Sequence, residues 1–142
     1  MSYKLNLTLV YSSEFIKIEA DREQDYLLAT WLQQPTSATF REQLQWVTDY
    51  ALANHINKAL FDIRERAYLE VVDQNWLMRE IMPLFKENNL RFAYLISKTT
   101  LAAMDIFRIQ AAVEANMPGK NQMELNTFLN KDEAINWLMQ TR

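Results

Sequence analysis

The stretch Lys58-Ala59-Leu60-Phe61-Asp62-Ile63 decides the fold of this 142-residue chain. Its apolar residues form a nearly continuous run, which is typical of a strand that is buried on both faces. Residues with helical apolar spacing lie on both sides of this run, in one segment that follows Pro35 and in another that begins near Asp73. A buried strand between two helices predicts an α/β fold.

The other elements follow outward from this strand. Three strand patterns come before the first helix, and strand and helix patterns alternate after the central strand. The expected order is therefore βββαβαβαβα, a mixed sheet covered by about four helices in one domain over residues 1–142. Besides the segments above, we expect strands at 5–9, 16–21, 26–32, 92–97 and 123–129, and helices at 102–113 and from Asn130 onward.

Polar residues and a proline mark where the helices begin and bend. Thr39 and Glu42 have the spacing of a capping box, although Thr36 or Ser37 could cap the first helix instead. Pro83 lies inside the apolar stripe of the second helix. Because proline has no backbone N–H, it should kink this helix or end it early.

The composition excludes several classes of protein. The chain has one Gly, no Cys and one His. It therefore lacks the residues for a glycine-rich phosphate loop, a disulfide, a thiolate zinc site or a two-histidine metal site. His55 is the one imidazole, and its place near the end of the first helix favours a structural role. We therefore expect no catalytic site, no metal and no cofactor.

Charge and hydropathy limit which kinds of partner the chain can have. The formal net charge is −3, and the basic residues are scattered among the acidic ones, so nucleic acid is not an expected partner. No apolar run approaches the roughly 20 residues that span a bilayer, and residues 1–10 have no signal-peptide pattern. We therefore expect a cytoplasmic protein without an integral membrane segment.

Three residues around the central strand are candidate site residues. Asp62 interrupts an apolar strand, and a buried carboxylate needs a partner that offsets its desolvation. Arg64 comes two positions later, so it projects to the same side if the strand continues. The two form either a structural ion pair or a contact with a ligand or partner. Trp76 is either a core residue or an aromatic anchor for a partner.

Several short segments, taken in order, carry a family resemblance. They are Trp31-Leu32, Phe40-Arg41, the central run 59–64, Asp73 with Trp76-Leu77, Pro83, Arg91-Phe92-Ala93 and the closing pattern Phe128…Asp132-Glu133-Ala134…Trp137-Leu138. Together they cover most of the chain, which resembles the bacterial SpoIIAA-like family of STAS/SEC14-type domains. The resemblance implies a STAS-like fold, with helices mainly on one face of a mixed sheet. It also implies an interaction module, and some relatives bind nucleotides or lipids.

The resemblance also bears on regulation. In SpoIIAA-type relatives an Asp-Ser pair opens the helix after the central strand, and a partner kinase phosphorylates the serine. Asp73 matches the acid, but Gln74 stands where the serine would be and cannot accept a phosphate. The resemblance therefore implies a regulatory or protein-interaction module without the serine phosphoswitch.

We thus expect a non-enzymatic interaction module whose partner is a protein. The candidate binding residues are Asp62, Arg64, Asp73, Gln74 and Trp76. The last three would face the partner at a helix start, where free backbone N–H groups favour an acidic group. The alternative is a carrier of a small apolar or lipid-like ligand, because the chain has seven Met and 49% hydrophobic residues. A further alternative is a homodimer that forms through an edge strand such as 123–129.

Overall fold

The computed structural model describes residues 4–66, 68–98, 108, 111 and 124–140. They form a six-stranded sheet whose strands lie side by side in the order of the sequence. The first three strands are an antiparallel meander, and the third to the sixth are parallel. The strands are β1 (Thr8–Ser12), β2 (Ile16–Asp21), β3 (Tyr26–Trp31), β4 (Lys58–Asp62), β5 (Arg91–Leu95) and β6 (Leu125–Phe128).

Three helical segments accompany the sheet in this part of the chain. Two of them are single helices, and one runs through two α-helices joined by a π-helical turn. They are α1 (Ser37–Ala53), the succession of α2 (Val71–Trp76), η1 (Leu77–Ile81) and α3 (Met82–Glu87), and α5 (Lys131–Met139).

The predicted α/β class and mixed sheet are confirmed, and the described order is βββαβαββα. The described residues thus hold three helical segments, where the sequence predicted four. The predicted helix 102–113 lies outside the described residues, apart from Arg108 and Ala111.

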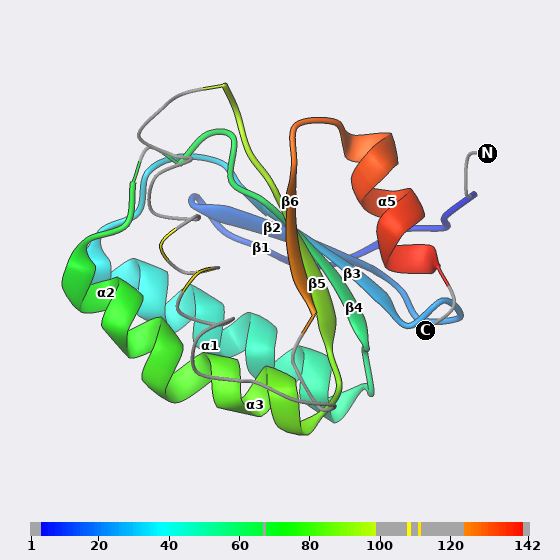
Figure 1. Cartoon of the computed structure of the whole chain (residues 1–142), viewed down its shortest axis with the longest axis horizontal. Helices are drawn as coiled ribbons and strands as arrows, with labels where there is room; N and C mark the ends of the chain where they lie inside the picture. Colours follow the sequence, from blue (N-terminus) through cyan, green and yellow to red (C-terminus); the bar gives the residue numbers. More distant parts are fainter. Residues whose placement is uncertain (1–3, 67, 99–107, 109–110, 112–123, 141–142) are drawn as a thin grey trace.

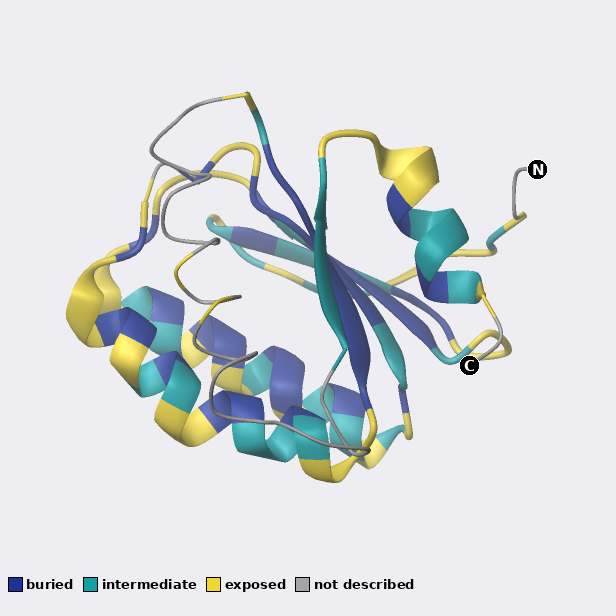
Figure 2. Ribbon diagram, in the orientation of Figure 1, coloured by how far each residue is buried: buried dark blue, intermediate teal, exposed yellow. Residues whose placement is uncertain are grey.

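Helices cover both faces of the sheet (Figure 1). α1, α2 and α3 enclose the larger core, in which Ile18, Phe61 and Ile81 are buried. α5 packs on the other face, where Ala134 and Leu138 join a smaller core. The middle strands are therefore buried from both sides (Figure 2), which explains the continuous apolar run of β4.

The first strand departs from the prediction. We expected Leu5, Leu7 and Leu9 to alternate along a half-buried strand, but β1 begins at Thr8 and Leu9 is 57% exposed. β1 is an edge strand of the described sheet, and its register against β2 shifts between Leu9 and Tyr11. Fewer elements cover an edge strand, and a bulge turns side chains away from the regular alternation.

Both ends of α1 are closed by local hydrogen bonds. The side-chain oxygen of Thr36 accepts a bond from the backbone N–H of Thr39 at 3.2 Å, so Thr36, one of the predicted alternatives, is the N-cap. At the other end His55 has a φ of 54°, and Ile56 donates its backbone N–H to the carbonyl of Ala51 at 2.9 Å. This Schellman-type ending places His55 directly after the last turn of α1, near the helix end where the sequence placed it.

The second helical segment accommodates Pro83 without ending there. It begins at Val71, two residues before the predicted start at Asp73. In η1 the turn widens, and the backbone N–H of Met82 donates to the carbonyl of Leu77, five residues earlier. Pro83 follows in the first turn of α3, where its missing N–H has no partner to lose. Of the two predicted alternatives, a kink or an early end, the early end does not occur, because the wider turn accommodates the proline.

Candidate functional site

A pocket of about 300 Å³ lies at the carboxyl ends of β3 and β4. We call it the edge pocket. It is formed by the loop that follows β3, the first turn of α1 and the segment that leads into α2, and Gln34, Ser37, Phe40, Leu69 and Asp73 are among its lining residues. In sheets with parallel strands, ligands bind beyond the carboxyl ends because the connecting loops converge there.

A pair of hydrogen bonds joins two loops across the edge pocket. The side-chain amide of Gln34 donates from Nε2 to the carbonyl of Tyr68 at 2.9 Å. In return, the Gln34 Oε1 accepts the backbone N–H of Tyr68 at 3.3 Å. One side chain thus satisfies both backbone groups of a residue 34 positions away, which holds the segment before α2 against the loop after β3.

Asp73 joins the first turn of α1 to α2. Its side chain is 3% exposed, and its Oδ1 accepts bonds from the Ser37 hydroxyl at 2.6 Å and from Arg41 Nε at 2.8 Å. The Arg41 guanidinium also lies 5.4 Å from the centroid of the Trp76 ring. A buried carboxylate needs such partners, because the loss of hydration is otherwise uncompensated. Asp73 therefore lines the pocket as a buried residue bonded to α1, whereas we expected it at the surface of the helix start.

Gln74 and Trp76 also point into the protein. Gln74 is 5% exposed, its Nε2 donates to the carbonyl of Leu69 at 2.6 Å, and its Oε1 accepts a bond from Arg108. Trp76 is half-buried, and its ring stands edge-on to Phe40 with the ring centroids 6.1 Å apart. Of these three residues only Asp73 lines the edge pocket, whereas Gln74 and Trp76 lie behind it and hold α1, α2 and Leu69 together.

Asp62 and Arg64 form the ion pair that their spacing predicted. Arg64 donates from Nε and Nη2 to the two carboxylate oxygens at 3.0 and 2.8 Å, and from its backbone N–H at 3.2 Å. The side-chain hydrogen bond to Asp62 raises the pKa of Arg64. Strand alternation places Asp62 on the same face of β4 as Leu60, in the smaller core under α5, and neither partner lines the edge pocket. The five predicted site residues therefore fall into two separate groups.

Sequence reasoning missed the exposed apolar residues beside the edge pocket. Tyr68, Val71 and Val72 are 47%, 56% and 57% exposed. We call these three residues the edge patch, and the exposed start of α2 that carries two of them is visible in Figure 2. The sequence did contain a signal, because the apolar residues of 68–72 stand in a segment that has the pattern of a loop and belong to no strand or helix pattern. An apolar residue in a loop, unlike one in a helix stripe, has no predicted burial.

The described part of the chain offers no cluster of side chains that could bind a metal ion. No three His, Asp or Glu side chains gather there closely enough to hold an ion. His55 is exposed at the far end of α1, away from the Ser37–Asp73 contact. Within this part of the chain, no helix combines the length and the apolar character that crossing a bilayer requires.

Comparison with known proteins yields no match to a family model, to a curated protein or to a solved structure.

Proposed function

We propose that this chain is a STAS-like, non-enzymatic regulatory module that binds a segment of a partner protein at the edge pocket. The observation that carries the proposal is the edge patch, three apolar side chains left exposed beside a pocket at the carboxyl ends of parallel strands. Exposed apolar side chains that gather beside a pocket are typical of protein-binding surfaces.

The chemistry of the pocket favours an apolar side chain of the partner as its occupant. Phe40 and Leu69 provide apolar walls, and the edge patch would cover the flanks of the bound segment. We expected an acidic group at the start of the second helix, but the carboxylates of Glu70 and Asp73 line the same pocket. Arg41 pairs with Asp73, so Glu70 is the carboxylate of this lining that would repel an acidic group, and an apolar anchor therefore fits better. A lipid-like ligand stays the alternative prediction, and the acidic residues Glu70 and Asp73 in the pocket lining do not favour it.

The surroundings of Gln74 support a module without the serine phosphoswitch. The side chain at this position is buried and bonds to Leu69 and Arg108. A phosphate group at this position would lose its hydration and would have to replace the hydrogen bonds to Leu69 and Arg108. Binding is also favoured over catalysis, because the Ser37 hydroxyl meets a carboxylate that Arg41 already neutralises and no imidazole stands beside it in the described structure.

The proposal is tested by charging the edge patch. A photo-crosslinking residue at Tyr68 should capture a specific protein from a lysate of the source cells, and Val71→Asp with Val72→Asp should abolish this capture. Acidic residues suit the first turn of a helix, so the double variant should remain folded. Leu9→Asp is the matched control, because Leu9 is as exposed as Val72 but lies on β1.

The outcome is decided by the two variants together. We expect the captured protein to be lost with the Val71 and Val72 variant and retained with Leu9→Asp. The proposal fails if wild type captures nothing above background, or if the double variant, with an unchanged melting temperature, captures the same proteins as wild type.

A further inference from the structure

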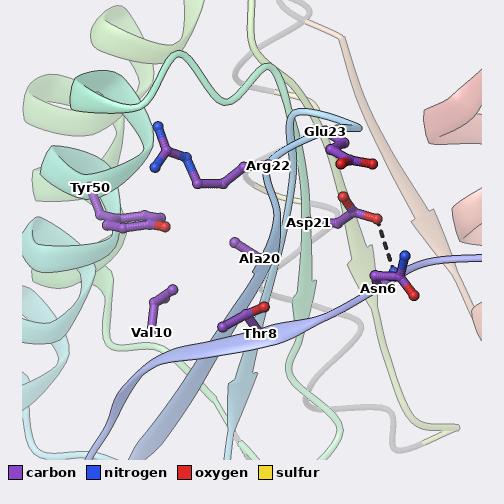
Figure 3. A pocket seen from close by; sticks show the side chains of 8 residues that line it. All are labelled: Asn6, Thr8, Val10, Ala20, Asp21, Arg22, Glu23 and Tyr50. Atoms are coloured by element: carbon purple, nitrogen blue, oxygen red, sulfur yellow. Dashed lines mark hydrogen bonds between the residues drawn. The ribbon is translucent and has the colours of Figure 1, made fainter.

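A second pocket, of about 420 Å³, lies at the opposite end of α1 from the edge pocket. We call it the ring pocket. It opens between β1, β2 and the last turns of α1, and its size is within the range of small-molecule sites. Figure 3 shows Tyr50 and Val10 on one side of it, with Ala20 and Thr8 at its back and Arg22 above.

The Tyr50 wall is the end of a ladder of stacked rings. The Tyr11 and Trp46 ring centroids are 4.4 Å apart, and those of Trp46 and Tyr50 are 5.4 Å apart with only 8° between the ring planes. Trp46 and Tyr50 are four residues apart on α1, so the helix itself holds them in register. In the described structure Trp46 is the one ring stacked on Tyr50, and the Tyr50 side chain also lines the ring pocket.

The ring pocket is lined by one basic residue, Arg22, and by two acidic residues, Asp21 and Glu23. Arg22 reaches over the Tyr50 side, whereas Asp21 and Glu23 lie on the other side of β2 (Figure 3). The Asp21 carboxylate is also engaged, because Oδ2 accepts the backbone N–H of Asn6 at 2.9 Å and Oδ1 that of Gln24 at 3.3 Å. Within the described ranges Arg22 makes no ion pair, which leaves its guanidinium available for an anion.

We propose that the ring pocket binds a small planar aromatic carboxylate. The ring of the ligand stacks on Tyr50 and becomes the fourth ring of the ladder, since offset stacking favours flat aromatic groups. Its carboxylate meets the Arg22 guanidinium, whose planar donors match two carboxylate oxygens. Ala20 provides an apolar wall of the same pocket, and the Thr8 hydroxyl is a further donor there.

The test is a calorimetric titration of the full chain with naphthalene-2-carboxylate. We expect saturable binding with a Kd below about 1 mM. Arg22→Gln should weaken it about tenfold or more, because a charge-assisted pair is lost, and Tyr50→Leu should weaken it to a similar degree because the stacking face is lost. Tyr50→Phe keeps the ring and should bind like wild type. Arg79→Gln removes an exposed arginine elsewhere and is the matched control.

Two further ligands separate the ring from the charge. Cyclohexanecarboxylate keeps the charge without a flat ring, and naphthalene-2-carboxamide keeps the ring without the charge, so both should bind at least about tenfold more weakly. The proposal is overturned if no saturable binding occurs, if Arg22→Gln and Tyr50→Leu bind like wild type, or if cyclohexanecarboxylate binds equally well. The variants of the edge patch change no residue of the ring pocket. The ligand-binding proposal and the protein-binding proposal can therefore fail independently of each other.

Discussion

Tyr26 carries a buried hydroxyl group whose hydrogen bonding is not satisfied by the described residues. Its side chain is fully buried in the smaller core beside Leu28 and Leu60, and its hydroxyl has no hydrogen-bond partner in the described structure. A buried hydroxyl without a partner costs about 1–3 kcal/mol, which the packing of the ring must offset. Burial, followed by the charges of Glu19 and Asp62, raises the pKa of Tyr26 well above its ordinary value.

This environment predicts how Tyr26→Phe changes the pH dependence of stability. Below about pH 10 the phenol keeps its proton in both states, so its contribution is constant. Above that pH the phenol ionises in the unfolded state first, because the folded state raises its pKa, and the free energy of unfolding falls. The variant should lose this part of the alkaline decline, and at pH 7 it should be as stable as wild type or more stable by about 1 kcal/mol.

Urea unfolding between pH 7 and 11 measures both effects. Tyr68→Phe is the matched control, because it removes the hydroxyl of an exposed tyrosine. A loss of more than about 1 kcal/mol at pH 7 in Tyr26→Phe would show that the hydroxyl has a stabilising partner.

The buried polar residues show what local sequence can reveal at this scale. Asp62 and Arg64 were predictable as a pair, because they are two residues apart at the end of β4. The partners of Asp73 were not, because Ser37 is 36 residues away and no local pattern relates the two. An acidic residue at a helix start is ordinarily solvated, and only a contact from α1 makes this one buried.

At the scale of elements, α1 ends in a conformation that glycine adopts more easily than histidine. His55 has a φ of 54°, which a residue with a Cβ adopts at a cost. His55→Gly should therefore stabilise the protein by up to about 1 kcal/mol, after the greater flexibility of glycine in the unfolded state is subtracted. Chemical denaturation at neutral pH measures the change.

A second substitution by glycine, two residues before His55, provides the contrast for this prediction. Ala53→Gly, at the last residue of α1, should destabilise the protein by about 0.5–1 kcal/mol, because it adds backbone freedom at a helical φ. If His55→Gly destabilised the protein as much as Ala53→Gly, the positive φ would not be the main influence on stability at this helix end.

The second helical segment illustrates an element that its residues predict only in part. The apolar stripe predicts a helix, and Pro83 predicts a disturbance. Whether the helix ends, kinks or widens depends on which alternative keeps Ile81, Met82 and Phe85 in the larger core. The π-helical turn at 77–81 lets the segment continue past the proline with all three buried.

At the scale of the whole molecule, Arg91 links α5 to the sheet. It is 7% exposed, and its Nη1 donates to the carbonyls of Trp137 and Gln140 at 2.7 and 3.0 Å, while its Nε donates to Glu124. Its guanidinium also lies 4.9 Å from the centroid of the Trp137 ring. One side chain from β5 thus bonds the end of α5 and the chain before β6.

Arg91→Leu should therefore loosen α5 more than the rest of the protein. We expect a loss of about 2 kcal/mol in the free energy of unfolding, because two carbonyls at the end of α5 lose a charged donor. Hydrogen exchange should quicken in residues 131–139 and remain slow in β3 and β4. Arg79→Leu, at an exposed arginine, should change stability by less than about 0.5 kcal/mol. Uniformly faster exchange in all strands would contradict a role confined to α5.

The sequence by itself determined the order of the described strands and helical segments, but not the π-helical turn at 77–81, because apolar periodicity and cap residues act over a few positions. Only the tertiary structure decided which residues those elements bury. It turned Asp73 and Gln74 inward and left Val71 and Val72 outside, and it brought Tyr11 of β1 onto Trp46 of α1. The physical reason is that burial and stacking depend on contacts between residues far apart in the chain, which a local pattern does not record.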